Sequence, residues 1–197
     1  MGMAAPSKVW TREEVLALQD AAPPGVRYEL IDGEMLVSPS PNDPHQQLVS
    51  LLSHFLNGYC RRHRIGRVLS SPADLSLDGK SILQPDVFVV PRGLPRSLRG
   101  WSHVTRLLLA VEVLSERTAR YDRVVKRHFL QRQGVPEYWV VDYRGSIVER
   151  WRPGDERPEQ LGEMLTWQPV PELEPLTIDL RELFEEAFGD LELGDDD

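Results

Sequence analysis

The chain has 197 residues and a formal net charge of −8, and its composition of 41% hydrophobic and 27% charged residues predicts one soluble globular domain. Its single cysteine, Cys60, excludes a disulfide framework and a metal site built from several thiolates. The N-terminus lacks the apolar stretch of a signal peptide and no window reaches membrane-spanning length, so we expect a cytoplasmic location.

The first half begins with a capping box, Thr11 followed by Glu14, which predicts a short helix over residues 11–20. Two short strands are expected around a turn at Asp32-Gly33, because this dipeptide is typical of hairpins. A long amphipathic helix follows over residues 43–63, with Asp43 as its predicted N-cap and Pro44 as its first helical residue.

The second half of the chain reads as strands with one intervening helix. The segment 106–114 is the most apolar and is predicted to be central in a sheet. The remaining elements are strands at about 67–70, 73–77, 86–90, 137–142 and 146–151, a basic helix over 118–133, one or two edge strands, a helix near 179–188 and an acidic tail over 190–197. This order predicts an α/β fold with a single domain over residues 1–197.

Charge is distributed unevenly along the chain. Between Arg61 and Arg132 there are 15 Lys and Arg residues against 6 Asp and Glu residues. A basic middle in an acidic chain can hold phosphate groups locally. The alternative is that these charges are a solvated surface without a partner.

One carboxylate, Glu112, lies inside the apolar run "LLLAVEVLS", where an ionised group needs a partner. Asp86 stands at the start of another apolar strand, 26 residues earlier, in "QPDVFVV". If the two strands are neighbours, both carboxylates can converge on one Mg²⁺ ion, which suits phosphodiester hydrolysis. The alternatives are a strand-initiating aspartate and a glutamate paired with arginine.

Lys126 is the candidate cation for this site, because its helix can pack back over the strand that carries Glu112. It also stands four residues after Asp122, the spacing of a helical ion pair. Spacing alone favours an ordinary surface ion pair over a contact with Glu112.

The segments "YELIDGEMLVSPSPNDPHQQL", "QPDVFVV" and "AVEVLSERTARYDRVVKRHFLQRQGVPEYWVVD" resemble the Uma-type family of restriction-endonuclease-like proteins, part of the PD-(D/E)xK nuclease superfamily. The resemblance covers roughly residues 11–151. It implies a restriction-endonuclease-like mixed β-sheet flanked by helices, with an N-terminal hairpin and C-terminal edge strands. It also implies a Mg²⁺-dependent site that cleaves DNA, in which Mn²⁺ would substitute.

Within the resemblance, Asp86 and Glu112 match the catalytic and metal-binding acids of the motif. Leu114 stands where the superfamily lysine is usual, and the family draws that lysine from the following helix, here Lys126. Glu29 matches an acidic position that would complete the metal shell, with a surface charge on the hairpin as the alternative. His45 matches a family position as well, although a capping or structural histidine is the simpler interpretation.

The expected partners are DNA and a second copy of the chain in a homodimer, with no membrane. The arginines predicted to contact DNA are Arg92, Arg96, Arg99, Arg123 and Arg127. The competing hypothesis is a catalytically inactive dimerising or DNA-binding module that retains the nuclease fold.

Overall fold

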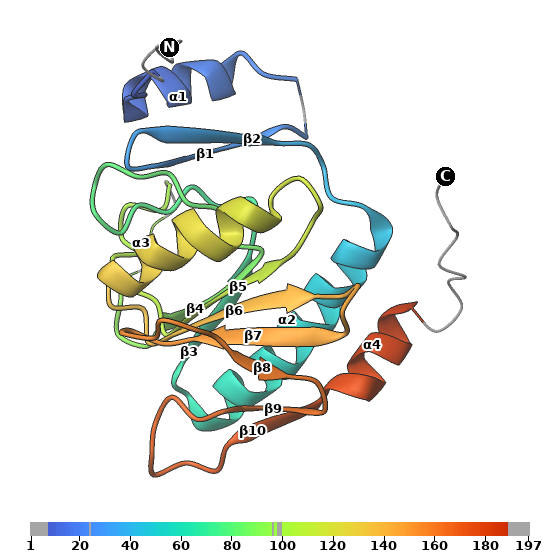
Figure 1. Ribbon diagram of the computed structural model, residues 1–197. Helices are drawn as coiled ribbons and strands as arrows, with labels where there is room; N and C mark the ends of the chain where they lie inside the picture. The colour runs from blue at the N-terminus through green and yellow to red at the C-terminus, as the bar shows by residue number, and fades with distance from the viewer. Residues whose placement is uncertain (1–7, 24, 96, 98–99, 189–197) are drawn as a thin grey trace, which may run out of the picture.

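The structure, a computed structural model, describes residues 8–23, 25–95, 97 and 100–188. Its centre is a mixed sheet in the order β3-β4-β5-β6-β7-β8, in which only the β5–β6 pair is parallel (Figure 1). The predicted mixed sheet with flanking helices is therefore confirmed. The strands are β3 Gly66–Ser70, β4 Val87–Pro91, β5 Leu109–Val113, β6 Glu137–Asp142, β7 Ile147–Trp151 and β8 Glu159–Leu161.

Strand β5 is central, as its apolar sequence predicted, because it pairs with β4 on one side and β6 on the other. Side chains alternate across a strand, so Leu109, Val111 and Val113 belong to the core on one face of the sheet. Ala110 belongs to the core on the opposite face. Glu112 follows the same alternation and points to the face of Ala110.

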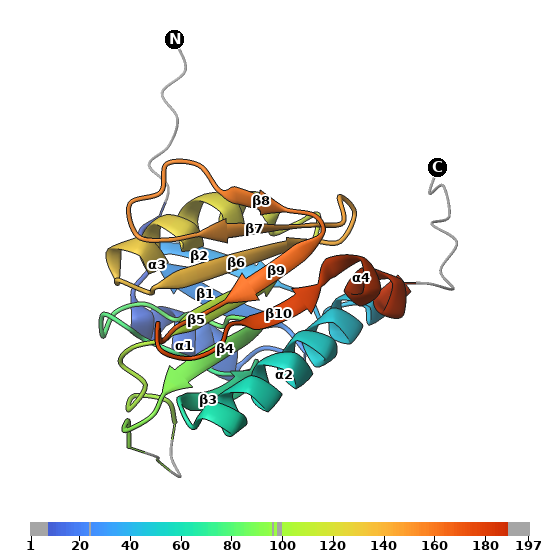
Figure 2. The same ribbon diagram turned by 90° about the horizontal axis from the view of Figure 1, so that it is seen from below.

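The first face of the sheet is covered by the long helix α2 (Asp43–His63) and the C-terminal helix α4 (Leu180–Phe188), as Figure 2 shows. The N-cap of α2 is Asn42, one residue before the predicted Asp43, because the Asn42 Oδ1 atom accepts a hydrogen bond from the His45 backbone N–H at 3.2 Å. An extended residue with a free side-chain oxygen is what the cap requires, whereas Asp43 already has helical backbone and lies in the first turn.

The opposite face is covered by a helix that begins as a π-helix, η1 (Tyr121–Lys126), and continues as α3 (Arg127–Arg132). This helix was predicted, but its wider first part was not. Phe129 and Leu130 are fully buried against the sheet and fix the helix in place.

An N-terminal layer lies beyond this helix and consists of α1 (Arg12–Asp20) and the hairpin β1 (Arg27–Ile31) and β2 (Glu34–Ser38) (Figure 1). The predicted capping box at Thr11 and Glu14 is present. The predicted turn is present too: Asp32 and Gly33 have φ values of 52° and 82°, the two positive values that a type I′ turn requires.

The predicted strand over residues 73–77 is wrong, since the segment makes only one isolated bridge, between Leu75 and Leu83. Ala73 and Leu75 are buried, which explains the strand-like alternation in the sequence. The Asp78 Oδ1 atom accepts hydrogen bonds from the backbone N–H groups of Lys80 and Ser81 and turns the chain before a ladder can extend.

The C-terminal part contains the short strands β8, β9 (Met164–Trp167) and β10 (Leu176–Asp179), rather than the predicted one or two, and the predicted helix follows as α4. The acidic tail over 190–197 lies outside the described residues. Within the described part of the chain, no helix combines the length and the apolar character needed to cross a membrane.

Candidate active site

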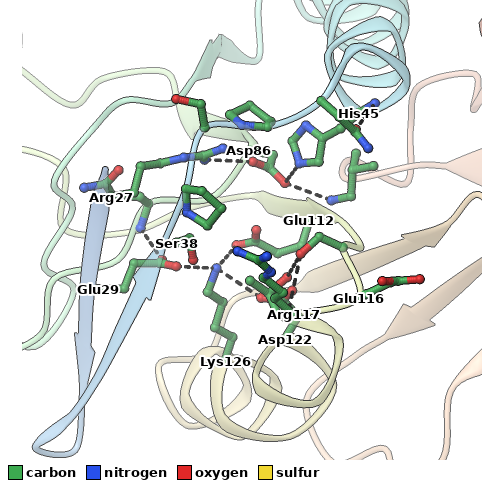
Figure 3. A pocket seen from close by; sticks show the side chains of 18 of the residues that line it. Arg27, Glu29, Ser38, His45, Asp86, Glu112, Glu116, Arg117, Asp122 and Lys126 are labelled. Carbon is green, nitrogen blue, oxygen red and sulfur yellow. Dashed lines mark hydrogen bonds and ion pairs between the residues drawn. The ribbon is translucent and has the colours of Figure 1, made fainter. Parts of the chain in front are cut away.

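A cavity of about 410 Å³ opens at the end of the sheet where β4 begins and β5 ends. The register explains why two acids meet there: β4 and β5 are antiparallel, with Val87 opposite Val111. The residue before β4 and the residue near the end of β5 therefore lie at the same end of this strand pair. These residues are Asp86 and Glu112, and both line the cavity (Figure 3).

Asp86 is buried and fully engaged by its neighbours. Its Oδ1 atom is 3.0 Å from an Arg27 guanidinium nitrogen, and its Oδ2 atom is 2.9 Å from His45 Nε2 and accepts a hydrogen bond from the Val113 backbone N–H at 2.9 Å. Burial alone would raise the pKa of Asp86, but the His45 hydrogen bond and the Arg27 charge outweigh it and hold the pKa at about 2. Asp86 is thus a fixed carboxylate.

Glu112 has the partner that its position in an apolar strand required. Its Oε1 atom accepts a hydrogen bond from Lys126 Nζ at 2.8 Å, because η1 runs back across the end of β5. Burial raises the pKa of Glu112 well above its ordinary value, although the nearby ammonium opposes the shift. The contact predicted from the resemblance is present.

Lys126 is also bound by two further carboxylates. Its Nζ atom is 2.8 Å from Glu29 Oε2 and 3.1 Å from Asp122 Oδ1. The ion pair of Asp122 with Lys126 that spacing favoured is present, but its predicted place at the surface is wrong, because Lys126 is 2% exposed and Asp122 is 1% exposed. Burial favours the neutral amine, but the charges of Asp122, Glu112 and Glu29 raise the pKa of Lys126 well above its ordinary value.

The cluster around Lys126 holds more acid than base. Three buried carboxyl groups share one ammonium, so full ionisation would leave a surplus of two negative charges away from water. Burial raises the pKa of Glu29 and that of Glu112, so each carboxyl takes up a proton more readily than an exposed one would. A proton or a further cation is what this cluster can accept.

Two acids at the cavity are candidate ligands for a hard divalent cation. Within residues 8–188, gaps excepted, no group of three or more His, Cys, Asp and Glu side chains is arranged to hold a metal ion. Two carboxylates, Asp86 and Glu112, nevertheless face the same cavity, and Mg²⁺ is commonly held by one or two carboxylates with water and substrate oxygens completing the shell.

The predicted catalytic residues Asp86, Glu112, Lys126 and Glu29 all line the cavity, and His45 lies with them. Glu29 is buried rather than a surface charge on the hairpin, because its Oε1 atom accepts a hydrogen bond from the Gln84 backbone N–H at 2.7 Å.

Of the predicted DNA-binding arginines, the three that the structure describes, Arg92, Arg123 and Arg127, do not line the cavity. Arg92 follows β4 at the end opposite Asp86, and Arg96 and Arg99 lie outside the described residues. Arg123 is paired with Asp142 and Glu149 at 2.7 and 2.8 Å. Arg127 lies over the ring of Trp151, 4.5 Å from its centroid.

Other cations line the cavity instead, namely Arg27, Arg117 and Arg144. Arg27 was missed, although it stands two residues before Glu29 on β1 and so shares its face. The burial of Lys126 also had a signal in the sequence. Phe129 and Leu130 follow it by three and four residues, which places the three side chains on one face of a helix.

The model of the Uma2 family, described as "Putative restriction endonuclease", matches residues 12–183. A search of the curated proteins returned no match. Among solved structures, a protein of Anabaena variabilis ATCC 29413, described as a "putative nuclease belonging to DUF820", superposes with a TM-score of 0.70 at 22% identity, covering 91% of this chain and 99% of its own. At this identity the likeness concerns the fold.

Proposed function

The chain belongs to the Uma2 family, and we propose that it is a metal-dependent endonuclease that hydrolyses phosphodiester bonds in DNA at the cavity where β4 begins and β5 ends. The observation that carries the proposal is the surplus of buried carboxylates around Lys126, beside the fixed carboxylate of Asp86. An arrangement of this kind lowers the free energy of unfolding and is typical of sites that bind cations and catalyse reactions.

Asp86 and Glu112 would hold a Mg²⁺ ion, for which Mn²⁺ would substitute. When bound, such an ion polarises the phosphodiester and lowers the pKa of a coordinated water molecule. The contacts from Arg27 and His45 keep the Asp86 carboxylate ionised and in one orientation, so its position is set before any ligand arrives.

Lys126 is proposed as the residue that stabilises the negative charge developing on the phosphate. Its ammonium stays protonated because Asp122 and Glu29 bind it from two sides, which also limits the directions in which it can move. Arg117, exposed at the mouth of the cavity, supplies a positive charge for the approaching backbone.

The competing function is a module that binds DNA or dimerises without cutting. The observation in its favour is that Lys126 and Asp86 are completely paired within the chain, which a stable inactive descendant would also retain. The presence of both acids and the lysine on one cavity favours the nuclease.

The test is cleavage of single-stranded and duplex DNA by the full chain with Mg²⁺ or Mn²⁺. We expect Asp86→Asn to abolish cleavage and Lys126→Met to lower the rate by ~10²–10³-fold, as loss of a positioned charge typically does. Glu163→Gln is the matched control, because Glu163 is exposed and lies outside the cavity. Wild-type protein that cuts no DNA with either metal, or an Asp86→Asn variant as active as wild type, would refute the nuclease proposal.

A further inference from the structure

A second pocket, here called the side pocket, lies directly against the cavity and has a volume of about 270 Å³. The residues that line both spaces, here called the shared wall, include Asp86. Six residues line both of them: Arg27, Ser40, Pro41, His45, Gln84 and Asp86. A molecule that reached Asp86 from the cavity would therefore have the side pocket beside it.

The side pocket differs from the cavity in its chemistry. Beyond the shared wall its lining is uncharged among the described residues, with valine and proline surfaces from Val26, Val49 and Pro72. The polar groups that it adds are mostly amides, including Gln19 on α1 and Gln46 on α2. A flat, neutral group with hydrogen-bonding edges suits this lining, whereas the charged cavity suits a phosphate with its cation.

Asp74 fixes the direction of two amides in the lining of the side pocket, Gln19 and Gln84. Its carboxylate accepts hydrogen bonds from Gln19 Nε2 at 3.0 Å and from Gln84 Nε2 at 2.6 Å, and Gln84 Nε2 also donates to the Tyr28 carbonyl at 3.4 Å. Because both nitrogens are held, only the Oε1 atoms remain for a ligand. Neither Oε1 has a hydrogen-bond partner in the described part of the chain, and both are shielded from water.

Unpaired buried acceptors are costly, so a ligand that brings N–H donors would relieve that cost after a small shift of the two side chains. Nucleobases carry such donors on their pairing edges. Access to the two acids is limited, because Asp86 is 5% exposed and Glu112 is 4% exposed. A phosphate must therefore enter below the molecular surface to reach these two acids.

We infer that the site takes an unpaired nucleotide, with its phosphate in the cavity and its base in the side pocket, and therefore that single-stranded DNA is the preferred substrate. In an intact duplex the base next to a phosphate is stacked and paired inside the helix, so it cannot enter a pocket beside that phosphate without being extruded. A single strand does not bear this cost. The inference rests on the proposed function and names its substrate.

The test compares two variants of adjacent exposed residues on α2. Gln46 lines the side pocket, whereas Gln47 lines neither space, so Gln46→Trp would fill the side pocket and Gln47→Trp is its matched control. Binding of a labelled strand of about 12 nucleotides, a length that spans the usual site of single-strand binding folds, is measured by fluorescence anisotropy with Ca²⁺ replacing Mg²⁺. The same sequence as a duplex is measured in parallel.

We expect wild-type protein to bind the strand roughly tenfold or more tightly than the duplex, and Gln46→Trp to lose roughly tenfold while Gln47→Trp binds like wild type. Gln19→Leu, which removes one amide oxygen acceptor together with the hydrogen bond to Asp74, should weaken strand binding without affecting duplex binding. Thermal unfolding of each variant verifies that it is folded.

Equal or tighter binding of the duplex, or strand binding that Gln46→Trp leaves unchanged, would overturn the inference. If either result is found and the wild-type protein still cuts duplex DNA, the nuclease proposal is retained and only the substrate inference fails. Conversely, selective strand binding that Gln46→Trp abolishes, in a protein that cuts no DNA, supports the substrate inference and removes the catalytic function.

Discussion

Glu112 illustrates the cost of the site at the level of a single residue. Its carboxyl is buried between an otherwise apolar strand and the Lys126 cluster, and burial raises its pKa well above the ordinary value. Burial that would let the Glu112 carboxylate bind a cation also costs free energy. When no cation is bound, this cost lowers the stability of the folded chain. Stability and function are expected to oppose each other here.

Substitution of Glu112 by glutamine should reveal this opposition as a pH dependence. Burial raises the pKa of Glu112 in the folded chain well above 4.5, so the folded state keeps a proton that the unfolded state loses. The resulting stabilisation is present below the unfolded pKa and disappears as the pH rises through the folded pKa. Because the glutamine side chain of the variant cannot titrate, the melting temperature of Glu112→Gln relative to wild type should increase from about pH 5 to about pH 8.

The measurement is thermal unfolding in metal-free buffer, with Glu163→Gln as the exposed control. A difference between Glu112→Gln and wild type that stays constant across this range would mean that Glu112 titrates normally in the folded chain.

At the level of elements, the π-helix η1 is the part of the fold that sequence periodicity did not predict. An α-helix over the same residues was expected, because a π-helix arises from one additional residue in a turn and leaves no distinct pattern in a single sequence. In η1 both Asp122 and Lys126 point toward Glu112, and Tyr138 Oη donates a hydrogen bond to the Asp122 carbonyl at 3.1 Å. π-Helical turns frequently occur at functional sites.

Deletion of Val124 tests the role of this segment. Val124 is 43% exposed, so its removal takes little from the core and should convert η1 into a continuous α-helix. With Phe129 and Leu130 still anchoring α3, the residues before the deletion would rotate and separate Asp122 from the site.

We expect the deletion variant to fold, to melt at a lower temperature and to lose DNA cleavage, whereas Val124→Ala should behave like wild type. Retained cleavage in the deletion variant would mean that the site does not depend on the π-helical turn.

The elements that could be predicted are those whose signals are local. The hairpin followed from Asp32-Gly33, and the central strand followed from the apolar run that contains Glu112. The segment 73–77 was mispredicted because buried alternating residues do not reveal whether a pairing partner runs alongside. The contact of Lys126 with Glu112 came from the family resemblance, since helical spacing alone favoured a surface pair.

At the scale of the whole molecule, the arginines of the basic middle segment are divided between structural and exposed positions. Arg123 and Arg127 are engaged with Asp142, Glu149 and Trp151, so abundance of arginine in the sequence did not locate the ones at the cavity. Which arginine is free depends on long-range packing, which composition does not report. The predicted homodimer stays a prediction.

Arg117 provides the test of electrostatic binding. It is exposed at the mouth of the cavity, so Arg117→Gln should remove one phosphate contact and lower the slope of log affinity against log salt by about one. Arg181→Gln is the control, because Arg181 is exposed but paired with Glu163 away from the cavity. If the affinity of the wild-type protein for DNA did not change with salt concentration, that result would favour a protein-interaction module instead.

A Mn²⁺ soak of crystals of the full chain tests the proposed metal site most directly. We predict a peak of anomalous scattering in contact with carboxylate oxygens of both Asp86 and Glu112, at metal–oxygen distances on the order of those that Mg²⁺ makes, ~2.0–2.1 Å or slightly longer. The peak should be absent from Asp86→Asn crystals. Well-ordered wild-type crystals in saturating Mn²⁺ with no peak between these two residues would contradict the metal-dependent nuclease.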